Sequence, residues 1–451
     1  MIPVFAVVGH PNKGKSSIVS TLAQDDSVAI SAQSGTTRVA EVLTVNVGNC
    51  QYRLVDTPGF QRPAKVLQWL QDHATGAEQR QTAVKKFVND EACRSRFPDE
   101  VQLLRPIVEG AAILYVVDGS RPYGPEYEAE MEILRWTGQA SMALINLIEN
   151  ESHIESWQQA LSQYFRIVKV FNAMQADFDK QLSVLEAFSH LKDEWKEAIE
   201  ALINEYKNLR ERQREERLRI LTRLLTDLCS YQVSQKVLTP AQAKSIQPVL
   251  EKRFYSGMRQ REAEAFEQLK NVYRYRNVQS DIYDLPFGDN LFDTEKWIVW
   301  GLNRKQLVTA ATLAGAATGA AVDVSLAGHT LLLGTIGGGL LAGGGAWLGA
   351  NRIAEFKLLG LPLGGYEARQ GPVRNRNFPY VVLGRFLFLD KALRERTHAR
   401  RDRIQINEGD LASLLDQLSG TEKKELHAAL DRLRRQRVVE TIEEVLRPLL
   451  D

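Results

Sequence analysis

The sequence predicts an α/β protein with a mostly parallel sheet, followed by a mostly helical domain with a hydrophobic helical hairpin and a small α+β C-terminal part. Three observations lead to this prediction. Short apolar strands alternate with helical patterns over residues 1–176, which is typical of a parallel sheet covered on both faces. Residues 177–264 are charged with helical periodicity, and residues beyond 358 mix β-rich runs with glycine and proline.

Length and composition set the outer limits. A chain of 451 residues exceeds what one hydrophobic core usually supports, so several domains are expected. With 44% hydrophobic and 25% charged residues, the chain is neither disordered nor a polytopic membrane protein, and a net charge of +1 gives no global reason to expect nucleic acid. Cys50, Cys93 and Cys229 show no paired metal-ligand spacing, which suits a reducing cytoplasm.

A glycine-rich loop follows the first predicted strand, Pro3 to Val8. It reads Gly9-His10-Pro11-Asn12-Lys13-Gly14-Lys15-Ser16, and Ser17 continues into a predicted helix. This G-x-x-x-x-G-K-S pattern between a strand and a helix is a P-loop. Its backbone N–H groups face phosphate, Lys15 reaches the β and γ phosphates, and Ser16 offers a hydroxyl to Mg²⁺. The loop therefore predicts a nucleoside triphosphate site.

Two further segments complete the predicted phosphate and metal site. The strand Asn49 to Val55 ends at Asp56, whose carboxylate would hold a magnesium water, and the Gly59 amide could approach the γ-phosphate. A polar loop before it contains Thr36 and Thr37. One of these, with Thr37 favoured, is expected to complete the magnesium shell and to sense the γ-phosphate. The metal ligands are thus predicted to be Ser16, Thr37 and Asp56.

The remaining elements of the first domain follow in alternation. Strands are predicted at Ala111 to Asp118, Ser141 to Asn146 and Arg166 to Ala173, with helices at Glu126 to Gly138 and Glu155 to Tyr164. Ligand binds at the carboxyl ends of strands in such sheets. The site is therefore expected at the edge where the P-loop begins.

These motifs together resemble the TrmE/Era/EngA branch of translation-factor-type GTPases. The resemblance rests on Gly-His-Pro-Asn-Lys-Gly-Lys-Ser-Ser, Gly-Thr-Thr-Arg, Asp-Thr-Pro-Gly-Phe and Val-Asp-Gly-Ser-Arg-Pro-Tyr-Gly-Pro-Glu. It implies hydrolysis of GTP to GDP and phosphate with Mg²⁺. Phe60 stands where Ras-type enzymes have a water-orienting glutamine, which implies slow turnover without dimerisation or a protein activator. Asn12 matches the asparagine with which several relatives hold K⁺, so Lys15, Asn12 and Thr37 are the expected catalytic residues.

The base-recognition motifs depart from that branch. The usual Asn-Lys-x-Asp reads Asn146-Leu147-Ile148-Glu149, so Asn146 is kept and the lysine is lost. Glu149 could still accept two hydrogen bonds from guanine. Asn172 and Ala173 resemble the loop that contacts the guanine O6. GTP is favoured as ligand, with ATP or relaxed specificity as the alternative.

The middle of the chain reads as helices. Apolar residues recur at helical spacing in two stretches separated by the polar run Arg210 to Arg217. Each apolar stretch lasts only about two heptads, which favours packing within one helical domain over an intermolecular coiled coil.

The segment Leu307 to Ala350 contains two apolar arms joined by a polar turn, Asp323 to His329. Glycines at four-residue spacing would let two helices pack closely, as in membrane helix pairs. Cations flank both outer ends, which places those ends on the cytoplasmic side of a membrane. We therefore expect a glycine-zipper hairpin associated with inner-membrane lipid; a hairpin buried within soluble protein is the alternative.

The last part is predicted to be small and mixed. Tyr380 to Leu383 and Phe386 to Leu389 have β-rich composition, and Leu411 to Leu450 reads as two amphipathic helices broken at Ser419-Gly420. A solvated face, an anionic lipid site and an RNA site are all compatible with the cations between them. These cations are Lys391, Arg394, Arg396, Arg400, Arg401 and Arg403.

The predicted domains are 1–176, a GTPase domain; 177–300, helical; 301–357, the hairpin; and 358–451, α+β and helical. The whole chain resembles a bacterial family that joins an Era-like GTPase domain to a C-terminal domain of unknown function. On this interpretation the protein is a nucleotide switch that controls a membrane-associated helical module. It is expected to be cytoplasmic and either peripheral to the inner membrane or anchored there by the hairpin. An RNA- or ribosome-associated assembly GTPase and a binding-only membrane scaffold are the alternatives, with RNA the less favoured partner.

Overall fold

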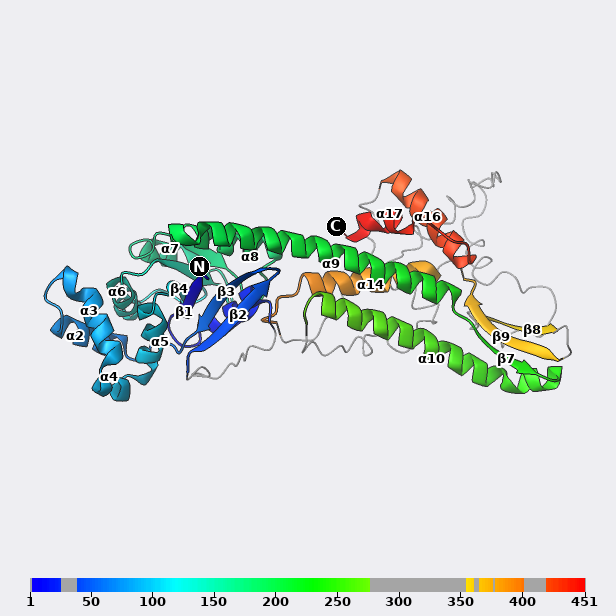
Figure 1. The fold of residues 1–451 in the computed structure, drawn as a ribbon, viewed down its shortest axis with the longest axis horizontal. Helices are drawn as coiled ribbons and strands as arrows, with labels where there is room; N and C mark the ends of the chain where they lie inside the picture. The colour runs from blue at the N-terminus through cyan, green and yellow to red at the C-terminus, as the bar shows by residue number, and fades with distance from the viewer. Residues whose placement is uncertain are drawn as a thin grey trace. The chain divides into compact units, whose positions relative to one another are not determined.

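The computed structural model describes residues 2–25, 39–275, 354–360, 365–375, 378–400 and 419–450 (Figure 1). The predicted hairpin and the two threonines at positions 36 and 37 lie outside these residues. The chain divides into two compact units. One comprises Met1–Arg212, Arg274–Val278 and Arg394–Asp402, and the other comprises Gln213–Tyr273, Gln279–Leu393 and Arg403–Asp451.

The first unit contains a six-stranded sheet of order β2-β3-β1-β4-β5-β6. Only β2 is antiparallel to its neighbour, so the predicted parallel-dominated sheet is confirmed. Register places Val7 beside Asp56 and Asp118 beside Asn146, which brings the carboxyl ends of four strands to one edge. The strands are β1 Val4–Val8, β2 Glu41–Val47, β3 Cys50–Asp56, β4 Ala112–Asp118, β5 Ser141–Asn146 and β6 Val168–Phe171.

Both faces of this sheet are covered, as the alternation along β1 requires. Phe5 and Val7 join one hydrophobic cluster, and Ala6 and Val8 join the other. The first cluster includes side chains of α1, α8 and the start of α9, and the second includes side chains of α2–α7. The helices nearest the sheet are α1 Lys15–Ala23, α6 Glu128–Trp136, α7 Ile154–Leu161 and α8 Phe178–Ser189, with short 3₁₀ turns at Pro125–Tyr127 and Asp193–Trp195.

Four helices between β3 and β4 had no counterpart in the sequence analysis. They are α2 Pro63–Asp72, α3 Arg80–Asn89, α4 Glu91–Arg96 and α5 Pro98–Val108, with a 3₁₀ turn at Ala77–Gln79. Local signals do mark their ends. Asp90 caps α4 by accepting from the Cys93 N–H at 2.8 Å, and a proline begins both α2 and α5.

The stripe of apolar residues in the first half of α9 (Lys196–Ser230) packs on the sheet of the first unit. Ile199, Leu202 and Tyr206 are buried there, next to Trp195, whose ring lies 5.2 Å from that of Phe5. The stripe is therefore buried within the chain. The polar run Arg210 to Arg217 leaves the helix unbroken.

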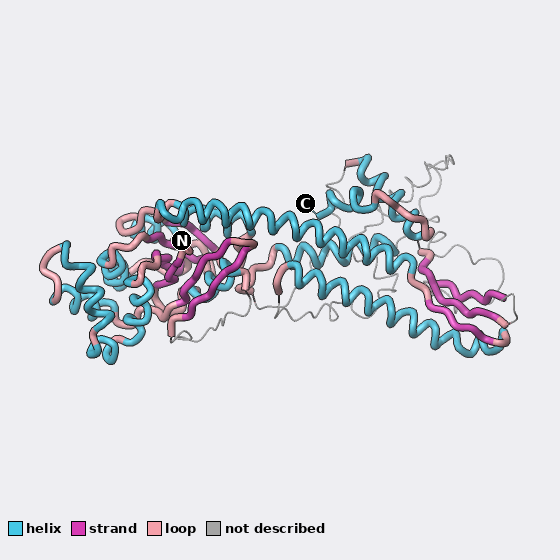
Figure 2. The backbone as a smooth tube through the Cα atoms, in the orientation of Figure 1, coloured by secondary structure: helices cyan, strands magenta, loops and turns pink. Residues whose placement is uncertain are grey.

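The second unit combines long helices with a small antiparallel sheet of order β7-β9-β8 (Figure 2). Buried ion pairs join its helices: Arg217 to Asp390 at 2.8 Å, and Arg385 to both carboxylate oxygens of Glu262. Its elements are β7 Val233–Val237, α10 Pro240–Val272, β8 Ala354–Gly360, β9 Tyr366–Val373, α14 Phe378–Arg394, α16 Gly420–Arg434, α17 Ile442–Leu446 and a 3₁₀ turn Arg447–Leu450. The predicted combination of helices with a small C-terminal sheet is confirmed.

Two local predictions were wrong. Tyr380 to Leu383 and Phe386 to Leu389 are helical in α14, because Phe378, Val382 and Phe386 recur at four-residue spacing and are all buried. Strand β7 interrupts the stretch predicted to be wholly helical, pairing with β9. In the tail, Ser419 caps α16, so a helix begins at the predicted break Ser419-Gly420, and a further helix, α17, follows after Arg434; the part of the tail before Ser419 lies outside the described residues.

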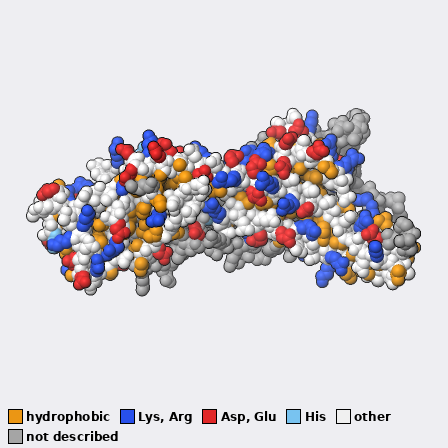
Figure 3. All heavy atoms as spheres, in the orientation of Figure 1, with side chains coloured by type: hydrophobic (Ala, Val, Ile, Leu, Met, Phe, Trp, Pro, Cys, Tyr) orange, Lys and Arg blue, Asp and Glu red, His pale blue; other side chains and the backbone are white. Residues whose placement is uncertain are grey.

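Exposed side chains of both charge signs cover the long helices (Figure 3). Within the described ranges, every helix is too short or too polar to cross a membrane.

Candidate nucleotide-binding site

The P-loop, Gly9 to Ser16, connects the end of β1 to the start of α1 and needs its two glycines. Gly9 has φ +145° and Gly14 has φ +80°. A Cβ at Gly9 would lie 2.3 Å from the Val116 carbonyl oxygen, and one at Gly14 would lie 2.3 Å from Asn146 Nδ2. Asn12 also has a positive φ, +61°, a region in which asparagine is tolerated. These backbone angles give the loop its bend.

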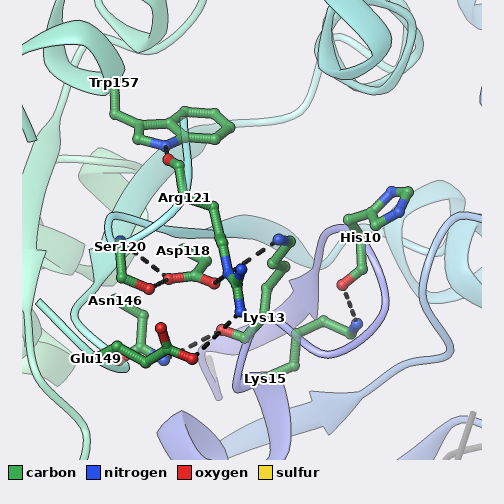
Figure 4. A network of polar contacts seen from close by, with 9 residues as sticks. All are labelled: His10, Lys13, Lys15, Asp118, Ser120, Arg121, Asn146, Glu149 and Trp157. Carbon is green, nitrogen blue, oxygen red and sulfur yellow. Dashed lines mark hydrogen bonds and ion pairs between the residues drawn. The ribbon is translucent and has the colours of Figure 1, made fainter. Parts of the chain in front are cut away.

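Lys15 lies inside that bend. Its ammonium donates to the carbonyl oxygens of Gly9 at 3.3 Å and His10 at 3.0 Å (Figure 4). Burial lowers the pKa of Lys15 to about 8, opposed by the nearby carboxylates of Asp56 and Glu130. The cation is therefore buried and close to the loop backbone that would hold phosphate.

The predicted metal ligands Ser16 and Asp56 lie together. The Ser16 hydroxyl donates to Asp56 Oδ2 at 2.7 Å, because β3 delivers the carboxylate beside the P-loop strand. Hydroxyl and carboxylate oxygens are the hard donors that Mg²⁺ prefers, so this pair fits the ion. Thr37, the third predicted ligand, lies outside the described residues.

The segment Asp56–Arg62 lies against the P-loop. The Thr57 hydroxyl donates to the Val7 carbonyl at 2.7 Å, and the Phe60 N–H donates to the Gly9 carbonyl at 3.2 Å. A Cβ at Gly59 would lie 2.5 Å from the Pro11 nitrogen, so only glycine fits this close approach. Gly59 thus lies next to the P-loop.

The P-loop also contacts a buried carboxylate, Glu130, which the sequence analysis did not assign to the site. Glu130 on α6 lies 2.7 Å from His10 Nδ1 and accepts from the Tyr115 hydroxyl at 2.9 Å. Glu130 is fully buried. Its only sequence signal is an acidic residue at an inward position of an otherwise apolar helix face. The contact anchors the loop to α6.

Asn146 connects the P-loop to the loop after β6. Its amide nitrogen donates to the Lys13 carbonyl at 3.1 Å, and its amide oxygen accepts from the Ala173 N–H at 3.3 Å. The neighbouring Asn172 accepts from the Met174 N–H at 2.9 Å. The structure therefore brings these predicted base-recognition residues together.

Glu149 lies at the more exposed side of the same region. Its side chain is 59% exposed, and its Oε1 lies 3.2 Å from Arg121 Nη2. Figure 4 shows this ion pair. Arg121 Nε and Lys13 Nζ both lie within 4 Å of Asp118, a buried carboxylate at the end of β4 that the sequence analysis did not assign to the site. Exposed ion pairs contribute little, so Glu149 can exchange Arg121 for another partner.

The far end of α1 contacts a segment from the C-terminal half of the chain. The Ser20 hydroxyl donates to the His398 carbonyl at 3.0 Å, and the Thr21 hydroxyl donates to the Ala173 carbonyl at 2.8 Å. The His398 ring stacks on Tyr275 with 4.4 Å between ring centroids. Helix α1 therefore begins at the phosphate site and ends against the segment 394–400.

One residue of the predicted cationic face is not exposed to solvent. Arg396 is buried, and its guanidinium donates to the Arg400 carbonyl at 3.0 Å, so it does not belong to a solvated arm. Arg401 and Arg403 lie outside the described residues.

Two family models match the chain. A model described as "50S ribosome-binding GTPase" matches residues 4–147, and one described as "Domain of unknown function (DUF3482)" matches residues 158–444. Residues 4–147 are therefore similar to that family of P-loop GTPases.

Individual relatives match over part of their length. GTPase Der of Mycoplasma pneumoniae is 29% identical over 187 residues, covering 42% of this chain and 32% of that protein. GTPase Der of Azoarcus sp. is 29% identical over 144 residues, covering 32% and 27%. The chain thus spans about a third or less of these curated relatives. A crystal structure of Era in complex with MgGDPNP and 16S ribosomal RNA nucleotides is 20% identical, with a TM-score of 0.29, and covers 38% of this chain and 51% of that chain.

The burial of Lys15 predicts a pH dependence of nucleotide binding. The affinity for GTP should fall as the pH rises above about 8, because the ammonium form attracts phosphate and the neutral amine does not. Equilibrium binding from about pH 7 to about pH 10 measures this effect. In the matched variant Lys15→Arg the side chain stays charged over this pH range. Any GTP affinity that remains in this variant should therefore not show the loss above about pH 8 that is expected of the natural chain. An unchanged dissociation constant for the natural chain would contradict the prediction.

Proposed function

We propose that this chain, which belongs to the family of the domain of unknown function DUF3482, hydrolyses GTP and uses its nucleotide state to control the helical part of the chain. The observation that supports this most directly is the P-loop with Lys15 buried inside its bend and the Ser16–Asp56 pair beside it. These groups are what a magnesium-bound triphosphate requires.

In this mechanism the chain binds, orients and neutralises the phosphates. Lys15 and the inward N–H groups of the P-loop contact the phosphate oxygens, and Ser16, Asp56 and Thr37 would hold Mg²⁺. When bound, the ion neutralises charge developing on the phosphates. Phe60 is fully buried and has no polar group that could orient a water. We therefore expect slow turnover that rises on dimerisation or with a protein activator.

Two finer features belong to the same proposal. Asn12, in its left-handed conformation at the loop apex, is the residue expected to hold K⁺. Glu149 is expected to accept hydrogen bonds from guanine after releasing Arg121, supported by the exposure of that ion pair. Asn146, Asn172 and Ala173 would complete the base side, with GTP preferred to ATP.

Within the first unit, the nucleotide state would be transmitted through α1 to the segment 394–400. The first residues of α1, Lys15 and Ser16, lie at the phosphate site, and Ser20 near its other end contacts His398. A helix moves as a rigid element, so a shift at the phosphate end would reach the segment 394–400.

We further propose that the hairpin Leu307 to Ala350 brings the protein to the cytoplasmic side of the inner membrane. The support is its sequence: two apolar arms with small residues at four-residue spacing and cations at the outer ends. An RNA- or ribosome-associated role is the second candidate, because residues 4–147 match a family described as binding the 50S ribosome.

The hydrolysis proposal predicts that purified protein releases phosphate from GTP with Mg²⁺, and faster in potassium than in sodium buffer. Lys15→Ala should lower the rate by roughly 100-fold or more, because it removes a charge aimed at the transferring phosphoryl group. Lys180→Ala, at an exposed lysine, is the matched control and should keep the rate. Binding of GTP without phosphate release would favour a nucleotide-binding scaffold, and equal rates in sodium and potassium would remove the role of Asn12.

The localisation proposal predicts co-sedimentation with anionic liposomes. A variant lacking residues 307–350 should lose liposome binding and keep GTP binding, because the deleted part is remote in sequence from the P-loop. The same two proteins are tested against ribosomal RNA over a range of salt concentrations. Salt-sensitive RNA binding by both, with no liposome binding by either, would favour the assembly-factor role instead.

A further inference from the structure

Helix α5 reaches the end of the Asp56–Arg62 segment through a buried carboxylate. Glu100 is fully buried, and its Oε1 accepts from the Gln61 N–H at 3.0 Å and from the Arg62 N–H at 2.5 Å. The Arg62 guanidinium also lies over the ring of Phe97, the residue before α5, at 5.1 Å. At this end of α5, Glu100 therefore binds the backbone of Gln61 and Arg62, and Phe97 contacts the Arg62 side chain.

A carboxylate is costly to bury unless charged or polar partners compensate it. Here the compensation comes from the N–H groups of Gln61 and Arg62, which immediately precede α2 and both bind Oε1; Oε2 is buried and has no hydrogen-bond partner among the described residues. Hydrogen bonds to an ionised acceptor are stronger than neutral ones. Glu100 therefore ties the two residues that lead into α2 to α5.

This tie completes a set of contacts around Gly59. Upstream, the Thr57 hydroxyl donates to the Val7 carbonyl, and directly after Gly59 the Phe60 N–H donates to the Gly9 carbonyl. Downstream, the backbone next meets Glu100. Gly59 itself lies against Pro11 of the P-loop. The path of the backbone around Gly59 is thus fixed on one side by β1 and the P-loop, and on the other by Glu100.

We infer that Glu100 is a positioning residue that holds the Gly59 amide where a γ-phosphate would lie, so that it sets the preference for the triphosphate over the diphosphate. This inference rests on the proposed function. Glu100 touches no nucleotide atom and acts through the backbone of Gln61 and Arg62. On this inference GDP, which lacks the γ-phosphate, would depend on the P-loop and not on Glu100.

The test compares the affinities of the full chain for GDPNP and GDP, each with Mg²⁺, by calorimetry. Glu100→Ala should weaken GDPNP binding by about tenfold or more and change GDP binding by less than about threefold, since each lost hydrogen bond affects only the γ-phosphate contact. Glu100→Gln keeps an acceptor oxygen but not the charge, so the ratio of the two affinities should fall between those of the natural chain and Glu100→Ala.

Leu104→Ala is the matched control, on the same helix. Leu104 is fully buried in the apolar cluster on that face of the sheet and makes no polar contact with the Asp56–Arg62 segment. It should lower thermal stability and leave the affinity ratio unchanged. An unchanged ratio in both Glu100 variants, or an equal loss for GDPNP and GDP, would overturn the inference while leaving the proposed function in place. Failure of the natural chain to bind either nucleotide would overturn both.

Discussion

A loop that lines phosphate with backbone N–H groups must stay bent before the ligand arrives, and this constraint organises the first domain. The bend needs residues that tolerate positive φ, and Gly9, Asn12 and Gly14 supply it. It also needs an external scaffold, because a glycine-containing loop is conformationally permissive by itself. The scaffold here consists of side chains contributed by neighbouring strands and helices. Glu130 holds His10, Asn146 holds the Lys13 carbonyl, and each comes from a different element.

Buried carboxylates recur at the connections on which the nucleotide would act. Glu130 fixes the P-loop to α6, and Glu100 fixes the start of α2 to α5. Both are fully buried, so each stabilises its position only while its partners stay in place. Such contacts suit a switch, because they favour a small number of discrete arrangements over gradual deformation. The hydrogen bond between Ser20 and the His398 carbonyl likewise connects α1, which begins at the P-loop, to a segment from the C-terminal half of the chain.

The local order of the sequence predicts much of this domain but not its long-range contacts. The P-loop pattern defines a strand, a loop and a helix within a few residues, so Lys15, Ser16 and their surroundings follow from sequence alone. Asp56 follows because a parallel strand ends beside the loop. Glu130 does not, since its partner His10 is 120 residues away, and Glu100 is separated from Arg62 by 38 residues.

The errors in secondary structure have equally specific causes. Helices α2–α5 are short, and their turns contain few glycines that would mark them. The run around Val381 and Phe386 is rich in β-formers, but burial on several sides of α14 makes it helical. Strand β7 is found only through its pairing with β9, a segment more than a hundred residues later in the chain.

The most direct test of this account is hydrogen exchange on the full chain with and without GTP and Mg²⁺. We expect slower exchange at the P-loop amides, Gly9 to Ser16, together with a change at the segment 394–400, which α1 contacts through Ser20. Identical exchange at both places in the presence and absence of saturating GTP would contradict it.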